Sequence, residues 1–271
     1  MPSKHQKWRA ARLRCPVCSQ NLNFDGQGGL VDSQGHRFDI SSKGYVNFLS
    51  RKPGLGETYT KSFFSHRRRV FEAGFYDGLI SAIQTITARL KLQTALDAGC
   101  GEGFFARSLL KMPSPPQIYA LDISKDAVAL ACSGVRDDIF WMTADLANIP
   151  VQSGEIDLLF NILSPANYGE FARVLSKGGL IVKVVPGPSY FRELREVLGK
   201  KRPPNTEAAE YFSNHCEVAG REHVFHTFEV GEGLRESLFA MSPISFGEAL
   251  NHAPPLKSIT IDLDILIGRP K

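Results

Sequence analysis

The sequence of 271 residues lacks the features of membrane-spanning, secreted or disulfide-bonded proteins. No stretch approaches the 18 continuous apolar residues of a membrane-spanning helix, and the N-terminal residues contain no apolar core of the length that a signal peptide has. Its five cysteines are an odd number with only one close pair, which does not indicate a disulfide framework. We therefore predict a cytoplasmic protein with no membrane partner.

Two further absences narrow the chemistry. The sequence has no internal repeat, and no Ser-His-Asp or Cys-His arrangement that would indicate a covalent intermediate. The net charge of +4 and the pI near 8.8 are compatible with a nucleic-acid partner but do not require one. Basic residues gather within residues 1–14 and in the run Arg67–Arg69, although such runs are most often solvated surfaces.

One glycine-rich stretch is the most informative part of the chain. A short apolar run ends in Asp97, and a helix-like segment begins at Phe104. Between them lie Gly99, Gly101 and Gly103. Glycine has no Cβ, so this turn can take positive φ and let a ligand lie against bare backbone, while the helix N-terminus offers free N–H groups. The spacing G-x-G-x-G after an acid differs from the dinucleotide fingerprint and resembles motif I of class I S-adenosylmethionine (SAM) methyltransferases.

Short apolar runs alternate with helical patterns through the middle of the chain. The predicted strands are Ala95–Leu96, Gln117–Asp122, Ile139–Thr143, Glu155–Phe160 and Leu180–Val185. This alternation is typical of βαβ units and a parallel sheet. In the tail, residues 224–230 and 259–267 alternate like half-exposed strands, with a helix near 234–241 between them. We predict an α/β fold with a Rossmann-like methyltransferase sheet, parallel except for its closing antiparallel strands.

Polar residues follow four of the predicted strands, where open α/β sheets bind their ligands. Asp97 leads the glycine turn, and Asp122 can accept the two ribose hydroxyls of a nucleoside. Asp145, followed by Leu146, stands where methyltransferases of this class commonly hold the adenine amino group. Acids at strand ends are also ordinary helix caps, which explains Asp145 equally well. The candidate cofactor-binding residues are Asp97, Gly99, Cys100, Gly101, Gly103, Asp122, Asp145, Leu146 and Asn161.

The segment after the fourth strand is expected to face the transferring methyl group. Its residues Asn161, Ser164 and Pro165 are the catalytic candidates. Methyl transfer from a sulfonium depends largely on alignment of donor and acceptor. A ring N–H acceptor such as guanine N1 must also lose a proton, and the sequence does not single out the base.

The first 50 residues differ in character from the rest. Cys15 and Cys18 have the spacing of a zinc knuckle, and His36 follows a turn-rich stretch. No third cysteine is close, but Asp32 lies four residues before His36 and a carboxylate can bind zinc. A zinc site of these four residues and a metal-free ribbon are both open. We predict three regions: a ribbon-like domain at 1–43, a linker at 44–60 and a SAM-dependent domain at 61–271.

Several stretches together resemble the bacterial 23S rRNA (guanine-N1)-methyltransferases that modify a hairpin-loop guanine. The matching segments are Cys15-Pro-Val-Cys18, His36–Ile40, Lys43–Leu49, Arg67-Arg68, Glu72–Gly74 with Tyr76, Asp97–Gly103, Leu121–Lys125, Pro186–Pro188 with Glu193-Leu194, and Met241–Pro243. The glycine motif is common to class I methyltransferases, whereas the Lys-Gly-Tyr-Val-Asn segment and Pro-Gly-Pro are more specific. The family's third zinc cysteine falls at Asp32, so that site does not carry over intact.

The resemblance implies SAM as cofactor, 23S rRNA as partner, a zinc ribbon and often a homodimer. Arg67 and Arg68 match the family and are candidates to meet phosphates or the cofactor carboxylate, with a solvated helix face as the alternative. Tyr168, Tyr190 and Phe191 are candidates to stack on a base taken out of its loop, although ordinary packing explains each one taken singly.

Two other functions stay open at this stage. A small-molecule methyltransferase would have an enclosed apolar pocket over residues 161–165 and no salt-sensitive RNA binding. A non-catalytic RNA-binding factor on the same fold would not need Asp97, Gly99, Gly101 and Asp122 together.

Overall fold

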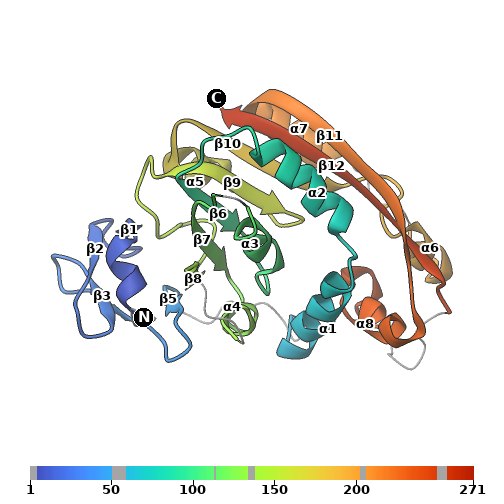
Figure 1. The fold of residues 1–271 in the computed structure, drawn as a ribbon, viewed down its shortest axis with the longest axis horizontal. Coiled ribbons are helices and arrows are strands. Elements are labelled where there is room, and N and C mark those ends of the chain that lie inside the picture. Colours follow the sequence, from blue (N-terminus) through green and yellow to red (C-terminus); the bar gives the residue numbers. More distant parts are fainter. Residues whose placement is uncertain (1–4, 51–58, 113, 134–137, 202–205, 249–254) are drawn as a thin grey trace.

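The structure is a computed structural model that describes residues 5–50, 59–112, 114–133, 138–201, 206–248 and 255–271. Its strands form two sheets, one of four strands in the order β1-β2-β3-β4 and one of eight in the order β11-β12-β10-β9-β6-β7-β8-β5. In Figure 1 the small sheet (blue) lies at one end, and the long strands β11 and β12 (orange and red) run along the opposite side. No helix in these ranges is long and apolar enough to cross a membrane.

The large sheet has the predicted class I methyltransferase arrangement. Its strands are β5 (Val46–Asn47), β6 (Thr94–Ala98), β7 (Gln117–Asp122), β8 (Phe140–Thr143), β9 (Ile156–Ile162), β10 (Leu175–Pro186), β11 (Cys216–Glu229) and β12 (Ser258–Pro270). The strands from β5 to β10 pair in parallel, while β12 pairs antiparallel with both β10 and β11. All five residues of β6 are buried, as expected for a central strand covered on both faces.

Helices cover the two faces of this sheet. They are α1 (Lys61–Glu72), α2 (Asp77–Thr87), α3 (Phe104–Leu109), α4 (Lys125–Ala131), α5 (Tyr168–Val174), α6 (Arg192–Val197), α7 (Thr206–His215) and α8 (Arg235–Ala240), with short 3-10 turns η1 (Gln6–Ala10), η2 (Glu232–Leu234) and η3 (Pro243–Ser245). One apolar core contains residues of α1 to α4, and the other contains residues of α5 and α7. Ser124 caps α4, because its hydroxyl accepts from Ala127 N–H.

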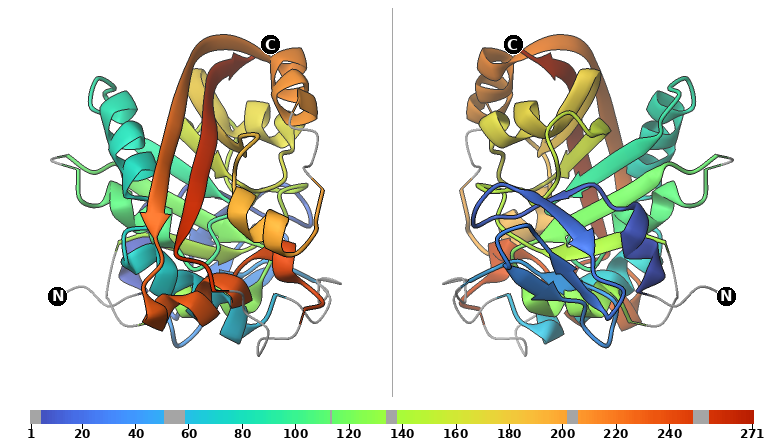
Figure 2. Two further views of the ribbon diagram at one scale, coloured as in Figure 1. Left: turned by 90° about the vertical axis from the view of Figure 1, so that its right-hand side faces the viewer. Right: turned by 90° about the vertical axis from the view of Figure 1, so that its left-hand side faces the viewer.

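The small sheet consists of β1 (Leu13–Arg14), β2 (Asn21–Phe24), β3 (Gly29–Val31) and β4 (Arg37–Asp39). It packs on the large sheet, as the end-on views in Figure 2 also show. Leu13 is fully buried and forms an isolated bridge with Val151, and Arg14 N–H donates to the Pro150 carbonyl at 3.2 Å. The ribbon therefore shares an apolar core with the large sheet.

The predicted linker at 44–60 needs one correction. Val46–Asn47 are not linker, because they form β5 and extend the large sheet by pairing with β8. Val46 is fully buried there, so an apolar residue that a linker would expose is part of the core. Residues 51–58 of that linker lie outside the described residues.

Candidate active site and metal site

The glycine turn after β6 requires glycine for two separate reasons. Gly99 and Gly103 have φ of 91° and 81°, which L side chains rarely adopt. A Cβ on Gly99 would lie 2.1 Å from Ser164 Oγ, and one on Gly103 would lie 2.4 Å from the Trp141 ring. The backbone at Gly99 is therefore in close contact with the loop after β9, which brings two of the predicted site segments together.

Asp122 holds the shape of this turn. Its Oδ2 accepts from Gly101 N–H at 2.9 Å, and its Oδ1 accepts from Ser124 N–H at 2.8 Å. A carboxylate has about four lone-pair directions, so two backbone donors leave capacity for ligand hydroxyls. Asp122 thus links the end of β7 to the glycine turn and keeps acceptors for a ligand.

Asp97 is deeply buried at the end of β6. Its side chain is 1% exposed, and Oδ2 has no hydrogen-bond partner among the described residues. Burial, and then the charge of Asp122, raise the pKa of Asp97 to about 7. Its side chain lies among Ile83, Phe105 and Phe160, so contact of this carboxyl with a cofactor stays a prediction.

Asn161 lies at the carboxyl end of β9, as predicted, but its side chain is hydrogen-bonded to the backbone on both sides of it, including the loop after β9. Its Nδ2 donates to the carbonyls of Ala98 at 2.7 Å and Pro165 at 2.9 Å. Its Oδ1 accepts from Nζ of Lys183, which also donates to the Ser164 carbonyl. The amide therefore positions the loop that carries Ser164, and the prediction of direct contact with the methyl group stays untested.

Lys183 is a residue that the sequence analysis missed. It lies on β10 and is 6% exposed, and burial lowers its pKa to about 8. The available signal was a single lysine inside the apolar run Leu180–Val185. A buried charge without a carboxylate partner is costly and therefore informative.

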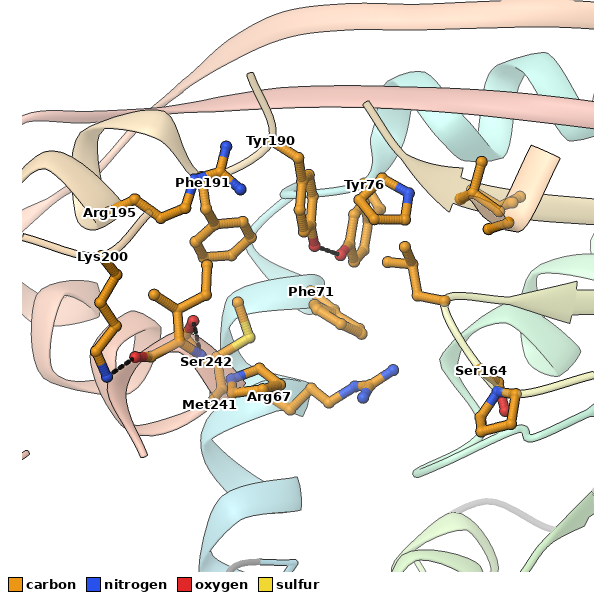
Figure 3. Close-up of a pocket in the computed structure, with 18 of the residues that line it drawn as sticks. Arg67, Phe71, Tyr76, Ser164, Tyr190, Phe191, Arg195, Lys200, Met241 and Ser242 are labelled. Carbon is orange, nitrogen blue, oxygen red and sulfur yellow. Dashed lines mark hydrogen bonds between the residues drawn. The ribbon is translucent and has the colours of Figure 1, made fainter. Parts of the chain in front are cut away.

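A cavity of roughly 650 Å³ opens next to this loop (Figure 3). Its described lining is mainly apolar and aromatic, with basic residues and no Asp, Glu or His. The lining residues are Arg67, Phe71, Tyr76, Leu163, Ser164, Pro165, Lys183, Val184, Val185, Pro186, Tyr190, Phe191, Arg195, Lys200, Lys201, Ala208, Met241, Ser242, Pro243 and Ile244. Apolar walls with a few polar groups are typical of a pocket for an organic ligand.

Two tyrosines that line this cavity are in direct contact. The hydroxyls of Tyr76 and Tyr190 are hydrogen-bonded to each other, and burial raises the pKa of Tyr76 to about 12. Tyr190 is held by the Pro186–Pro188 turn, in which Gly187 is essential because a Cβ there would lie 1.9 Å from Asp262 Oδ1. Pro-Gly-Pro therefore shapes the wall that carries Tyr190, a predicted base-stacking residue.

The two predicted arginines of α1 have different environments. Arg67 lines the cavity, its Nε lies 3.2 Å from Glu102 Oε2, and its guanidinium lies over the Phe71 ring at 5.0 Å. Arg68 instead donates to the Leu130 carbonyl at 2.8 Å and so ties α1 to α4. Arg67 keeps its place as a substrate or cofactor candidate, whereas Arg68 does not line the cavity.

One further sequence prediction is corrected, and another stays untested. Tyr168 does not line the cavity but is buried against α7, where its ring stacks on His215 with centroids 5.0 Å apart. It is therefore unavailable for base stacking. Asp145 is exposed and its Oδ1 accepts from Ala147 N–H at 2.9 Å, which forms a local turn, while Leu146 packs on the core beneath it. Neither residue lines the cavity, and adenine contact by this pair stays a prediction.

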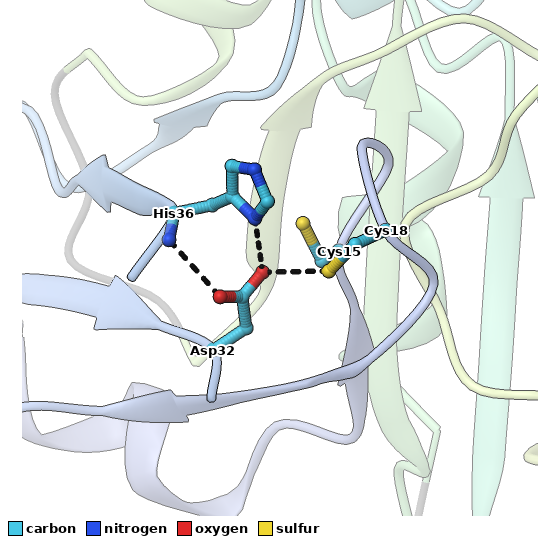
Figure 4. A group of neighbouring side chains, drawn as sticks. All are labelled: Cys15, Cys18, Asp32 and His36. Atoms are coloured by element: carbon cyan, nitrogen blue, oxygen red, sulfur yellow. Dashed lines mark hydrogen bonds and ion pairs between the residues drawn. The ribbon is translucent and has the colours of Figure 1, made fainter. Parts of the chain in front are cut away.

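The four predicted metal ligands come together in the ribbon (Figure 4). Ligand atoms of Cys15, Cys18, Asp32 and His36 all lie within 4.8 Å of one another. Asp32 Oδ2 is 3.0 Å from Cys18 Sγ and 2.8 Å from His36 Nδ1. Burial opposes ionisation of Asp32, but hydrogen bonds from both cysteines and from His36 outweigh it and lower its pKa. Two sulfurs, one carboxylate oxygen and one imidazole nitrogen fit a tetrahedral zinc ion.

Comparison with known proteins matches both parts of the chain. The family model "Methyltransferase domain" matches residues 95–179, and the zinc-ribbon model "RlmA, N-terminal" matches residues 13–51. A relative from Bacillus subtilis (strain 168), which carries the provisional name 23S rRNA (guanine-N(1)-)-methyltransferase YxjB, is 33% identical over 94% of this chain and 96% of its own. The 23S rRNA (guanine(748)-N(1))-methyltransferase of Streptomyces fradiae is 26% identical over 95% and 96% of the two chains. A malonyl-[acyl-carrier protein] O-methyltransferase of Methylovorus sp. (strain MP688) is 30% identical over 47% of this chain and 52% of its own.

Proposed function

Because the chain belongs to the 23S rRNA (guanine-N1)-methyltransferase family, we propose that it transfers the methyl group of SAM to N1 of a hairpin-loop guanine in 23S rRNA. The observation that carries this proposal is the cavity with aromatic walls and basic residues beside the glycine turn. A flipped-out base needs such a pocket because the methyl donor cannot reach a base inside a stack.

The glycine turn fits SAM in its chemistry. The turn at Gly99–Gly103 offers bare backbone, Asp122 keeps acceptors for ribose hydroxyls, and the buried Asp97 lacks a partner for Oδ2. Arg67 lies between this turn and the cavity, where it can meet a carboxylate or a phosphate. SAM supplies an electrophilic methyl group, and these residues hold and orient its carrier.

The cavity fits a guanine in size and in kind. Tyr76, Tyr190 and Phe191 provide aromatic surfaces for stacking, which is a common means of holding single-stranded bases. Arg195, Lys200 and Lys201 belong to the same lining and are suited to the phosphates that flank a target nucleotide. The lining thus combines a surface for the base with charges for the backbone.

We also propose that the ribbon binds one zinc ion through Cys15, Cys18, Asp32 and His36. Support comes from the convergence of these four ligand atoms and from the match to the RlmA zinc ribbon. The role of zinc would be to fix the short strands β1 to β4, because a sheet of this size buries little surface by itself.

A homodimer is proposed on the same family grounds. The 14-residue strand β11 is the edge of the large sheet, and its Phe225 is 56% exposed. A long exposed edge strand is a feature that proteins usually cover. Sedimentation velocity of the chain and of Phe225→Asp tests this, and a monomer for both at micromolar concentration would contradict it.

One observation favours a second candidate, a small-molecule methyltransferase. The cavity lies over Leu163–Pro165, where that function requires a pocket. Against it stand three of the basic residues of the lining, Arg195, Lys200 and Lys201, and the family to which the chain belongs.

Methyl transfer from labelled SAM to 23S rRNA without native modifications tests the proposal. N1-methylguanine blocks the pairing edge, so we expect a reverse-transcription stop at one hairpin-loop guanine. Asp122→Ala should abolish the stop, and Asp126→Ala, an exposed acid in the first turn of α4, should keep it. Binding of SAM without any transfer to rRNA would favour the small-molecule function, and absence of SAM binding would favour a non-catalytic RNA-binding factor.

A further inference from the structure

Lys183 is held in an unusual position for a lysine, inside a central strand. Its neighbours Val182 and Val184 on β10 are fully buried, and its partners in register are Asn161 on β9 and Leu266 on β12. Nζ donates to two neutral oxygens, Asn161 Oδ1 and the Ser164 carbonyl, and the structure describes no carboxylate in contact with it. The strand therefore presents an amine to the cavity without an acid to keep it charged.

The described lining of the cavity contains other ionisable groups, whose environments differ from that of Lys183. They are Arg67 of α1, Tyr76 before α2, Tyr190 after β10, Arg195 of α6, and Lys200 and Lys201 after α6. Guanidinium groups do not lose their proton in proteins. Burial raises the pKa of both tyrosines, which are hydrogen-bonded to each other. Lys200 is paired with Glu248 at 3.4 Å, and Lys201 is exposed at the rim.

The bonds of Lys183 also define where a lone pair would lie. A neutral amine has two N–H groups, and the two bound acceptors use both. The lone pair then takes the remaining tetrahedral direction, on a side chain whose residue belongs to the cavity lining. Asn161 links this amine to Ala98, the residue before Gly99, so the amine is close to the predicted methyl donor site. Burial lowers the pKa of Lys183 to about 8, which makes the neutral form accessible near neutral pH.

We propose that Lys183 is the general base that removes the N1 proton of the target guanine, an assignment that rests on the proposed function. Lys183 Nζ takes the proton and becomes an ammonium group. The electron pair of the N1–H bond forms the N1–CH3 bond, and the pair of the S–CH3 bond stays on sulfur, leaving S-adenosylhomocysteine. The ammonium group then releases its proton to water, so that charge and atoms balance.

The test compares two variants with the full-length protein and unmodified 23S rRNA. Lys183→Arg keeps donors for Asn161 and Ser164 but cannot act as a base near neutral pH, and Lys183→Met removes both functions. We expect both variants to lose about 10²-fold or more in single-turnover rate, while SAM affinity by calorimetry changes less than about threefold. The wild-type rate should rise with pH and level off near pH 8, whereas the Lys183→Arg rate should keep rising.

Two readouts separate a base from a residue that only holds the loop. Replacing the target guanosine by 6-thioguanosine, whose N1–H is more acidic, should shrink the Lys183→Arg defect, because the reaction then depends less on a base. Lysine-labelled NMR of the unliganded protein should show one signal, absent in Lys183→Arg, that titrates near pH 8. The assignment would be overturned if Lys183→Arg had the same rate and pH profile as the wild type. It would also be overturned if the NMR spectrum lacked the signal that titrates near pH 8. If the wild type binds SAM but methylates no rRNA, the proposed function fails and the assignment falls with it.

Discussion

The substitution Asp97→Asn should stabilise the unliganded protein at alkaline pH. Because the pKa of Asp97 is raised from 3.8 to about 7, the folded state holds a proton that the unfolded chain has released between these values. The free energy of unfolding of the wild type therefore falls as pH rises through this window, by about 1.4 kcal/mol per pH unit. From pH 5 to pH 7 the loss amounts to about 3 kcal/mol as an upper limit, and it is complete by pH 8.

Asparagine cannot ionise, so the variant lacks this loss. Its amide also needs a partner that Oδ2 of Asp97 does not have, which costs about 1–3 kcal/mol at every pH. The quantity to measure is the free energy of unfolding of the variant minus that of the wild type. This difference at pH 8 is then compared with the same difference at pH 5. Urea unfolding at both pH values should show that this difference is larger at pH 8 than at pH 5 by about 3 kcal/mol or somewhat less. Calorimetry should show that the variant binds SAM more weakly than the wild type.

Asp157→Asn is the matched control, because the pKa of Asp157 is lowered. Burial opposes ionisation there, but N–H groups of Gln93 and Thr94 and the Ser176 hydroxyl donate to the carboxylate and outweigh it. Its contribution is present above the unfolded pKa and is lost only as pH falls through a still lower value. Asp157→Asn should therefore destabilise the protein equally at pH 5 and pH 8. A constant difference for Asp97→Asn as well would refute a raised pKa at Asp97.

Three further predictions concern the turn, the metal and the cavity. Gly99→Ala should lower SAM affinity more than 10-fold because its Cβ would meet Ser164, whereas Gly154→Ala, also at positive φ but with open space, should leave affinity unchanged by calorimetry. Wild-type protein should contain about one zinc per chain by mass spectrometry; Asp32→Ala should lose it and Asp32→Cys should retain it. Tyr190→Ala should raise KM for rRNA about 10- to 100-fold with unchanged SAM affinity, and an unchanged KM would exclude base stacking there.

Much of the fold and part of the site could be predicted from the sequence. The alternation of apolar runs and helical patterns predicts the parallel sheet, since the spacing of apolar residues in a strand or in a helix is a local property of the chain. The glycine spacing with Asp97 marks the cofactor turn, because positive φ is a property of single residues. The C-x2-C pair with Asp32 and His36 could likewise be predicted, since all four ligands lie in one short stretch of the sequence.

Other features of the site were decided by contacts between distant segments. Lys183 meets Asn161 only because β10 and β9 are paired in that register. Tyr76 meets Tyr190 only because the segment between α1 and α2 packs against the segment after the Pro-Gly-Pro turn, where the Phe75 and Phe191 rings are also in contact. Tyr168 has the same local character as a pocket aromatic, yet α7 covers it. The sequence by itself determined which residues can turn, cap or bind. Tertiary packing decided which of them face the cavity, because strand register and helix docking depend on the whole core.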